Sequence, residues 1–144
     1  MNKVKQILKV KGNQVWKVSK DATVLEALEI MAEKQISSVM VVDGDQIAGI
    51  FTERDFARKV GLRDIPPSAV KVGDIMSRDL ITVEPETSVN QCMAIITESR
   101  IRHLPVMEDG QLVGLVSIGD VVKDIIEELQ FMVKQLENYV IYFR

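Results

Sequence analysis

Two pairs of oxygen-bearing side chains share one spacing in this 144-residue sequence. Thr52 precedes Asp55 by three residues, and Ser117 precedes Asp120 by three residues. A hydroxyl followed three positions later by an acid is a near-match to the helix capping box, although glutamate or glutamine is the usual acidic partner. Capping alone explains a single copy, but it does not demand aspartate in both. The four residues are therefore candidates for ligand binding as well as for capping.

The other reactive side chains form no catalytic or metal-binding pattern. His103 is the only histidine and Cys92 the only cysteine, so neither a Cys/His zinc site nor an internal disulfide can form. No Gly-x-x-x-x-Gly-Lys-Ser/Thr loop is present, and His103 has no nucleophile motif to serve. We interpret Cys92 as a core residue of a helix. The sequence predicts that the protein is not an enzyme and has no catalytic residue, metal ion or catalytic cofactor.

The sequence contains one segment twice, displaced by 65 residues. This displacement aligns residues 36–42 with residues 101–107, and it also places Asp55 on Asp120 without a gap. We therefore expect one module over residues 1–144. Its predicted parts are a first repeat at 15–59, a linker at 60–79 that contains paired prolines, a second repeat at 80–124 and a C-terminal extension at 125–144.

Within each repeat, the hydrophobic spacing changes in the same order. The elements predicted for the first repeat are a strand at 16–18, a helix from Val24 to Met31, strands at 39–42 and 47–51, and a helix after Thr52. The second repeat has the corresponding strand at 81–83, helix at 89–96, strands at 104–107 and 112–116, and helix after Ser117. The predicted fold class is α/β (α+β), with two β-α-β-β-α repeats related by a pseudo two-fold and small mixed sheets flanked by helices.

The last predicted helix is longer than its counterpart in the first repeat. Its apolar residues fall on one side: Val122, Ile125, Ile126, Leu129, Met132, Val133 and Leu136. Such a stripe needs a partner. It either docks on a second chain, with Tyr139, Tyr142 and Phe143 adding to the contact, or folds back on its own domain.

Composition restricts the partners and the location. The formal net charge is −3, from 18 Lys and Arg against 21 Asp and Glu, so no nucleic-acid partner is expected. The longest apolar runs have the length of a strand, and no apolar segment near the N-terminus resembles a secretory signal. We therefore expect no membrane partner and, with a single cysteine, a cytoplasmic location.

The paired pattern resembles a CBS-domain pair (Bateman module), the tandem module named after cystathionine β-synthase. The resemblance covers most of the chain and rests on segments that occur in order and in register. They are Gly49-Ile-Phe-Thr-Glu-Arg-Asp55 and Gly114-Leu-Val-Ser-Ile-Gly-Asp120 at the repeat ends, Val72-Gly-Asp-Ile-Met-Ser77 in the linker, Leu80-Ile-Thr-Val83, and Ile101-Arg-His-Leu-Pro-Val106.

The resemblance implies a binding site for an adenosine-containing ligand at the end of each repeat. Asp55 and Asp120 are then expected to accept hydrogen bonds from the ribose hydroxyls, and Thr52 and Ser117 to contact phosphate beside a helix N-terminus. The adenine is expected between strand and linker residues, namely Met76, Thr82 and Val83, or Trp16, Lys17 and Val18. For Gly49 and Gly114, we favour close packing of the strands over ligand access.

The two halves differ where phosphate is expected. The phosphate candidates are Arg54 and Arg58 in the first repeat and Arg102 and His103 in the second, because arginine can hold a phosphate bidentately. Surface arginines are usually only solvated, and His103 can equally be a strand histidine satisfied by the backbone. At the position of Arg54, the second repeat has Gly119.

The resulting hypothesis is a regulatory module that senses an adenine nucleotide. AMP or NAD(H) is favoured over S-adenosylmethionine, which carries a positive charge, and ADP and ATP belong to the same range. We expect a homodimer that passes its signal to a separate, unidentified effector protein. The alternative is a dimerising scaffold that binds no nucleotide.

Overall fold

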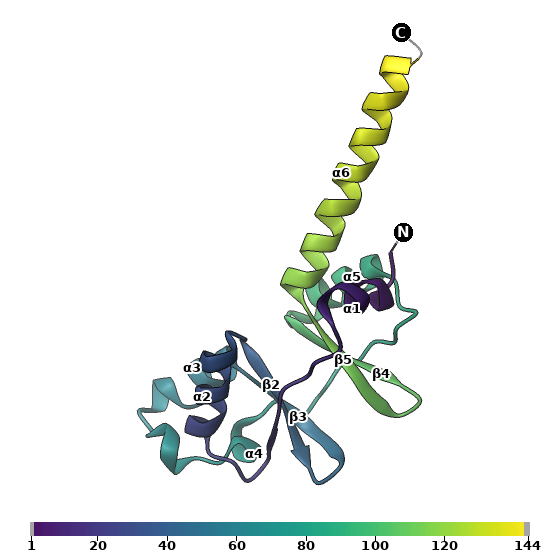
Figure 1. Cartoon of the computed structure of the whole chain (residues 1–144). Coiled ribbons are helices and arrows are strands. Elements are labelled where there is room, and N and C mark those ends of the chain that lie inside the picture. The colour runs from purple at the N-terminus through teal and green to yellow at the C-terminus, as the bar shows by residue number, and fades with distance from the viewer. Residues whose placement is uncertain (1, 143–144) are drawn as a thin grey trace. The chain divides into compact units, whose positions relative to one another are not determined.

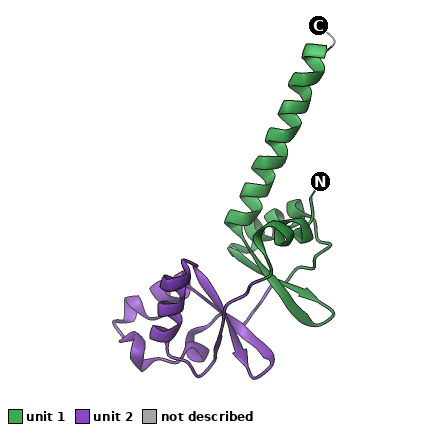
Figure 2. Cartoon of the chain, viewed as in Figure 1, with its two compact units in different colours: residues 1–13, 82–144 green, residues 14–81 purple. Residues whose placement is uncertain are grey.

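The structure is a computed structural model that describes residues 2–142 (Figure 1). The chain divides into two compact units (Figure 2). The first-repeat unit, purple in Figure 2, spans Gln14–Ile81. The second-repeat unit, green in Figure 2, combines the described residues up to Asn13 with those from Thr82 onward. Each unit has a small sheet flanked by helices, which confirms the predicted fold class.

In the first-repeat unit, one sheet has the strand order β1-β2-β3. β1 (Lys17–Ser19) pairs parallel with β2 (Ser38–Asp43), which pairs antiparallel with β3 (Gln46–Thr52). The helices of this unit are α2 (Val24–Lys34), α3 (Glu53–Lys59) and α4 (Val72–Ile75), with short 3₁₀ turns at Gly61–Arg63 and Pro67–Ala69. Its core includes Val24, Val39, Val41, Phe51 and Val72, all fully buried.

In the second-repeat unit, β4 (His103–Glu108) and β5 (Gln111–Ser117) form an antiparallel hairpin. α5 (Val89–Ser99) precedes the hairpin and α6 (Ile118–Tyr142) follows it directly. Ser88 caps α5 by accepting a hydrogen bond from the Gln91 backbone N–H at 3.1 Å. This cap matches that of α2, where Thr23 accepts from the Glu26 N–H. The core of the unit includes Val89, Cys92, Leu104 and Val106.

The strand predicted at 81–83 is reduced to a single parallel bridge between Val83 and Val106. In the first repeat, the Met40 N–H donates to the Trp16 carbonyl at 3.0 Å and so extends the pairing toward residue 16. The residue 65 positions after Met40 is Pro105, which has no N–H to donate. The prediction is therefore wrong for the length of this strand, because Pro105 removes the corresponding hydrogen bond.

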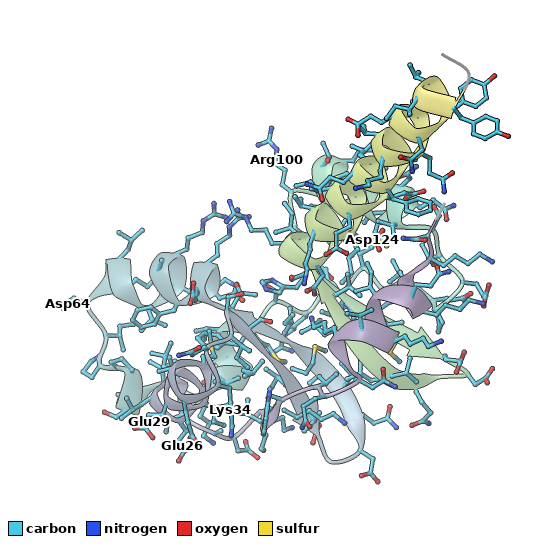
Figure 3. All side chains as sticks on the ribbon, turned by 45° about the horizontal axis from the view of Figure 1, so that its top comes forward. Glu26, Glu29, Lys34, Asp64, Arg100 and Asp124 are labelled. Atoms are coloured by element: carbon cyan, nitrogen blue, oxygen red, sulfur yellow. The ribbon has the colours of Figure 1, made fainter. Side chains whose placement is uncertain are left out.

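The chain begins with a helix that the sequence analysis did not predict, α1 (Val4–Lys11). Val4, Ile7 and Leu8 lie on its buried face and belong to the core of the second-repeat unit. The Asn2 side-chain amide donates to the Asp124 carboxylate on α6 at 3.0 Å, which helps to hold this end of the chain (Figure 3 labels Asp124). The segment that precedes the first repeat therefore packs on the second.

The reverse holds for the linker. The α4 segment precedes the second repeat but packs on the first, where the Ser77 N–H donates to the Ile50 carbonyl at 2.8 Å and the Ile50 N–H to the Ser77 carbonyl at 3.0 Å. We call residues 4–12 and 69–77 the leading segments, since the displacement of 65 also relates these two stretches. Each repeat is thus completed by the leading segment of the other.

The two repeated glycines face these leading segments. A Cβ atom on Gly49 would lie 2.5 Å from the Ser77 carbonyl oxygen, and one on Gly114 would lie 2.7 Å from a methyl group of Leu8. At Gly49 the neighbouring atom is backbone, so only a residue without a side chain leaves room, while a side chain at position 114 would require Leu8 to move. Close packing at both glycines is therefore confirmed, but the packing partners are the leading segments rather than neighbouring strands.

The last helix, α6, is continuous from Ile118 to Tyr142 and extends away from the other described elements of its unit (Figure 1). Its first buried residue is Val121, whereas Leu129, Val133 and Leu136 are 54–64% exposed. The helix packs on its own unit only up to Ile125, so the alternative in which it folds back on its own domain is wrong for the helix from Ile126 onward. Of the aromatic residues predicted to add to a contact, Tyr139 and Tyr142 are exposed, and Phe143 lies outside the described residues.

Candidate functional site

The first candidate site is the turn between β3 and α3, where Thr52 caps the helix. The Asp55 backbone N–H donates to Thr52 Oγ1 at 3.1 Å, and the Thr52 backbone N–H donates to Asp55 Oδ2 at 3.0 Å. These two bonds are the reciprocal pair of a capping box, with aspartate in place of glutamate. The capping interpretation is thus confirmed for this copy.

The Asp55 carboxylate has further partners on its other oxygen. The Ser77 hydroxyl donates to Asp55 Oδ1 at 2.9 Å, and the Lys59 ammonium lies 3.2 Å from the same atom. Lys59 also donates to the Ile75 carbonyl at 2.9 Å. Both oxygens of Asp55 therefore bind groups of the chain itself, and only 8% of the side chain is exposed.

The second candidate site is the turn between β5 and α6. Here the Asp120 N–H donates to Ser117 Oγ at 3.2 Å and the Ser117 N–H to Asp120 Oδ2 at 2.9 Å, so the same cap forms. The Lys11 ammonium, from the C-terminal end of α1, contacts Asp120 Oδ2 at 2.5 Å. In the described part of the chain, the two contacts to the carboxylate, from the Ser117 N–H and from Lys11, both fall on Oδ2, and the side chain is 25% exposed.

The charged groups around Asp120 shift the pKa values of Asp120 and His103. Burial raises the pKa of this carboxyl, but the hydrogen bonds from Lys11 and Ser117 outweigh burial, so its pKa is lowered. His103, half-buried at the start of β4 and paired with Ser117 across the hairpin, has a lowered pKa because of burial and because Lys11 is positively charged. Lys11, His103, Ser117 and Asp120 therefore form one cluster, which we call the second-repeat cluster.

The other predicted site residues lie in less enclosed places. Arg54 is half-buried in the first turn of α3, while Arg58, in its last turn, and Arg102, just before β4, are exposed. The predicted adenine residues divide between the units: Lys17, Val18 and Met76 belong to the first-repeat unit, and Thr82 and Val83 to the second. Val18, Met76 and Val83 are at most 8% exposed, whereas Lys17 and Thr82 are exposed.

Sequence reasoning missed three residues that contact the two acids: Lys11, Lys59 and Ser77. Lys59 had a signal, because it follows Asp55 by four residues on a helix. Ser77 and Lys11 come from the leading segments, and only the exchange of those segments brings them to the acids.

The described residues contain neither a membrane-spanning helix nor a metal-binding cluster. Between residues 2 and 142, no helix is long and apolar enough to cross a membrane. The same part of the chain has no cluster of histidine, cysteine, aspartate and glutamate that could hold a metal ion. Cys92 is fully buried and burial raises the pKa of its thiol, as a core residue requires.

Comparison with known proteins adds a family match. The model of the CBS domain matches residues 4–61 and 72–127. The CBS domain-containing protein CBSX3, mitochondrial, from Arabidopsis thaliana is 40% identical over 134 residues, which are 90% of this chain and 65% of that protein. The chain thus spans slightly less than two thirds of the length of this relative.

Solved structures give the same match. A protein with CBS domains from Burkholderia ambifaria MC40-6 is 49% identical, with a TM-score of 0.85 over 88% of this chain and 95% of that one. The CBS domain pair of protein MJ0100, in complex with 5′-methylthioadenosine and S-adenosyl-L-methionine, shares the fold with a TM-score of 0.77 at 22% identity, over 89% of this chain and 98% of that one.

Proposed function

Because the chain belongs to the CBS domain family, whose paired domains are in general regulatory rather than catalytic and bind adenosine-containing ligands, we propose that it is a sensor of an adenine nucleotide. The nucleotide is AMP, ADP, ATP or NAD(H), and its binding is passed as a signal to a separate effector protein. Residues 1–144 act as one module in this proposal. A cytoplasmic location stays a prediction, and the Arabidopsis relative is named as mitochondrial.

The observation that carries the proposal is the second-repeat cluster at the start of α6. Asp120 is partly exposed there, and its contacts within the described chain use only Oδ2. A carboxylate has about four lone-pair positions, so Oδ1 can accept ribose hydroxyls while the cap persists. The first backbone N–H groups of α6 lie at the same turn and favour an anion.

The nucleotide is favoured by the positive charges near the two acids. Lys11 stands at Asp120, while Arg102 and His103 belong to the same end of β4. Arg54 and Arg58 lie on α3 beside Asp55. A phosphate-bearing ligand such as AMP or NAD(H) gains from these groups, whereas S-adenosylmethionine adds a like charge. Thr52, Ser117 and the adenine residues named above complete the proposed contacts.

Signalling needs a ligand that distinguishes two states of the module. A nucleotide can shift an equilibrium between two arrangements only by its different affinity for them. We propose that the output is a change of conformation, which an effector protein recognises.

The experiment is a thermal-shift panel on nucleotide-stripped protein with AMP, ADP, ATP, NAD, NADH and S-adenosylmethionine, followed by calorimetry. A ligand at a hundredfold excess over its Kd raises the stability of the native state by about 2.7 kcal/mol, which a melting curve detects. A shift with phosphate-bearing adenosyl compounds supports the proposal. No shift with any of them favours the alternative, a dimerising scaffold that binds no nucleotide.

The homodimer in this proposal is formed through α6. Apolar residues recur every seven positions along the helix: Val122, Leu129 and Leu136; Ile125, Met132 and Tyr139; Ile126, Val133 and Val140. All of them are exposed except Ile125, which is half-buried against its own unit. Three apolar positions in seven give the face width that packs in helical bundles. Because a second copy carries the same stripe, a two-fold dimer can cover both stripes at once.

Sedimentation tests this interface. We expect the wild-type chain to be a dimer and Leu129→Lys to shift it toward monomer, since a charge would be buried in the stripe. Glu127→Lys changes a residue outside the stripe on the same helix and is expected to leave the dimer intact. If the wild-type chain sediments as a monomer, the proposed dimer is wrong, while the proposal of nucleotide binding is unaffected.

A further inference from the structure

Lys11 contacts Asp120, although it lies 109 residues earlier in the sequence, and is a candidate for determining ligand specificity. It ends α1, and its ammonium donates to two acceptors, Asp120 Oδ2 at 2.5 Å and the Leu115 carbonyl at 2.8 Å. These bonds hold a positive charge at the turn where α6 begins. An ammonium has three N–H donors, so one remains for a further partner.

The position of this charge follows from the exchange of leading segments. The Val4, Ile7 and Leu8 side chains bury α1 in the core of the second-repeat unit, and Gly114 leaves space for Leu8 to approach. Lys3 and Lys5 additionally pair with Glu86 at 2.8 and 2.9 Å. Lys11 is thus a side chain on an anchored helix rather than on a free tail.

The first repeat has no corresponding cation. The displacement of 65 places Lys11 on Met76, which is 8% exposed and apolar, and the leading segment there reaches its acid through the neutral Ser77 hydroxyl. Lys59 does pair with Asp55, but it comes from the second turn of α3 and is held by the Ile75 carbonyl. Among the described residues, a contact between a leading-segment lysine and the capping aspartate of the repeat therefore occurs only in the second repeat.

We infer that Lys11 is a specificity-determining residue, which makes the second-repeat site take adenosyl ligands that carry a phosphate in preference to those that do not. The inference rests on the proposed function and deepens it. Ribose hydroxyls bind Asp120 through Oδ1, and the spare N–H of Lys11 pairs with a phosphate at the start of α6. Neutral adenosine keeps the ribose contact but has no group for Lys11.

The influence of Lys11 on its neighbours supports this assignment. Its charge contributes to the lowered pKa of His103, so the field of the ammonium reaches across the cluster. Lys11 is itself partly exposed, at 35% of its side chain, so its ammonium is accessible to a ligand. The same field disfavours the sulfonium of S-adenosylmethionine.

The test is the ratio of the affinities for AMP and adenosine, measured by calorimetry on the full chain. Lys11→Met is expected to weaken AMP binding about tenfold or more, because a hydrogen bond between charged groups is lost, and to leave adenosine binding within about twofold. Lys9→Met, at an exposed position on the same helix, is the matched control and is expected to keep the ratio of the wild type. Lys11→Arg is expected to retain most of the preference.

The outcomes separate the two proposals. If the wild type binds AMP and Lys11→Met keeps the same preference for AMP over adenosine, the inference is overturned and the proposed function stands. If the wild type binds none of adenosine, AMP, ADP, ATP, NAD and NADH, both are overturned. Unchanged adenosine affinity in Lys11→Met also shows that the site is folded, so a loss confined to AMP cannot come from unfolding.

Discussion

Asp55 and Asp120 occupy the same position in two copies of one segment, yet their surroundings differ. Both close the same cap with a hydroxyl three residues earlier. Asp55 is 8% exposed and has partners on both oxygens, whereas Asp120 is 25% exposed and its contacts in the described chain fall on Oδ2. The cap is thus a property of the repeated segment, while the availability of the acid depends on which leading segment packs beside it.

The largest difference is expected in stability when each acid is removed. Asp55→Ala leaves the half-buried Ser77 hydroxyl and Thr52 N–H without their acceptor, and a cap is lost as well, so we expect a cost of about 3 kcal/mol. Asp120→Ala loses a cap and a partly exposed ion pair, worth about 1 kcal/mol. Urea denaturation of both variants measures the difference.

Equal costs in the two variants would contradict the comparison, because they would mean that the extra partners of Asp55 contribute nothing. A useful control is Ser77→Ala, which removes a hydrogen bond from Asp55 and leaves the cap of α3 intact. We expect it to cost about 1 kcal/mol, less than Asp55→Ala.

A smaller difference is expected between the two glycines. Gly49→Ala brings a methyl group against the Ser77 carbonyl oxygen, a backbone atom that also belongs to a hydrogen-bonded bridge, and overpacking of this kind costs about 2 kcal/mol. Gly114→Ala meets only the methyl groups of Leu8, which can turn away, so about 1 kcal/mol is expected. Thermal melts of the two variants rank them, and the reverse order would show that α1 is packed more rigidly than the linker.

The smallest effect concerns His103, which the first repeat replaces with Ser38. Burial and Lys11 lower the pKa of His103 in the folded state, so the unfolded chain takes up a proton first as the pH falls. Stability is therefore complete above the unfolded value of about 6.5 and decreases as the pH falls through the lowered pKa of the folded state. His103→Ser is expected to flatten unfolding curves measured between pH 7.5 and 5.5, and an unchanged slope would remove His103 from this role.

Most of the fold could be predicted because its determinants are local. The change from helical to alternating spacing located the helices and hairpins of both repeats, and Thr52 and Ser117 gave the starts of the helices that end the repeats. The α1 helix was missed because its apolar residues Val4, Ile7 and Leu8 are separated by lysines, which obscured their helical spacing. Their burial against the second repeat depends on contacts between residues far apart in the sequence.

The candidate site was predictable only in part, for the same reason. Repeat alignment identified both acids and both hydroxyls, since these lie three residues apart. The alignment did not show that the two acids have different partners. Those partners, Ser77 and Lys11, lie in the leading segments, outside the aligned repeats. The affinity of either acid for ribose stays a prediction.

The exchange of leading segments has a consequence for how the chain can be divided. A cut between residues 59 and 60, where the linker begins, would leave the second half without α1. Val4, Ile7 and Leu8 would then be missing from its core. The first half would lose α4 and, with it, Val72, Ile75 and the Ser77 bridge to Ile50. Each half, expressed alone, would therefore expose the core surface that a segment of the other half normally covers. The two pieces are thus expected to associate when mixed, as the fragments of a split protein do.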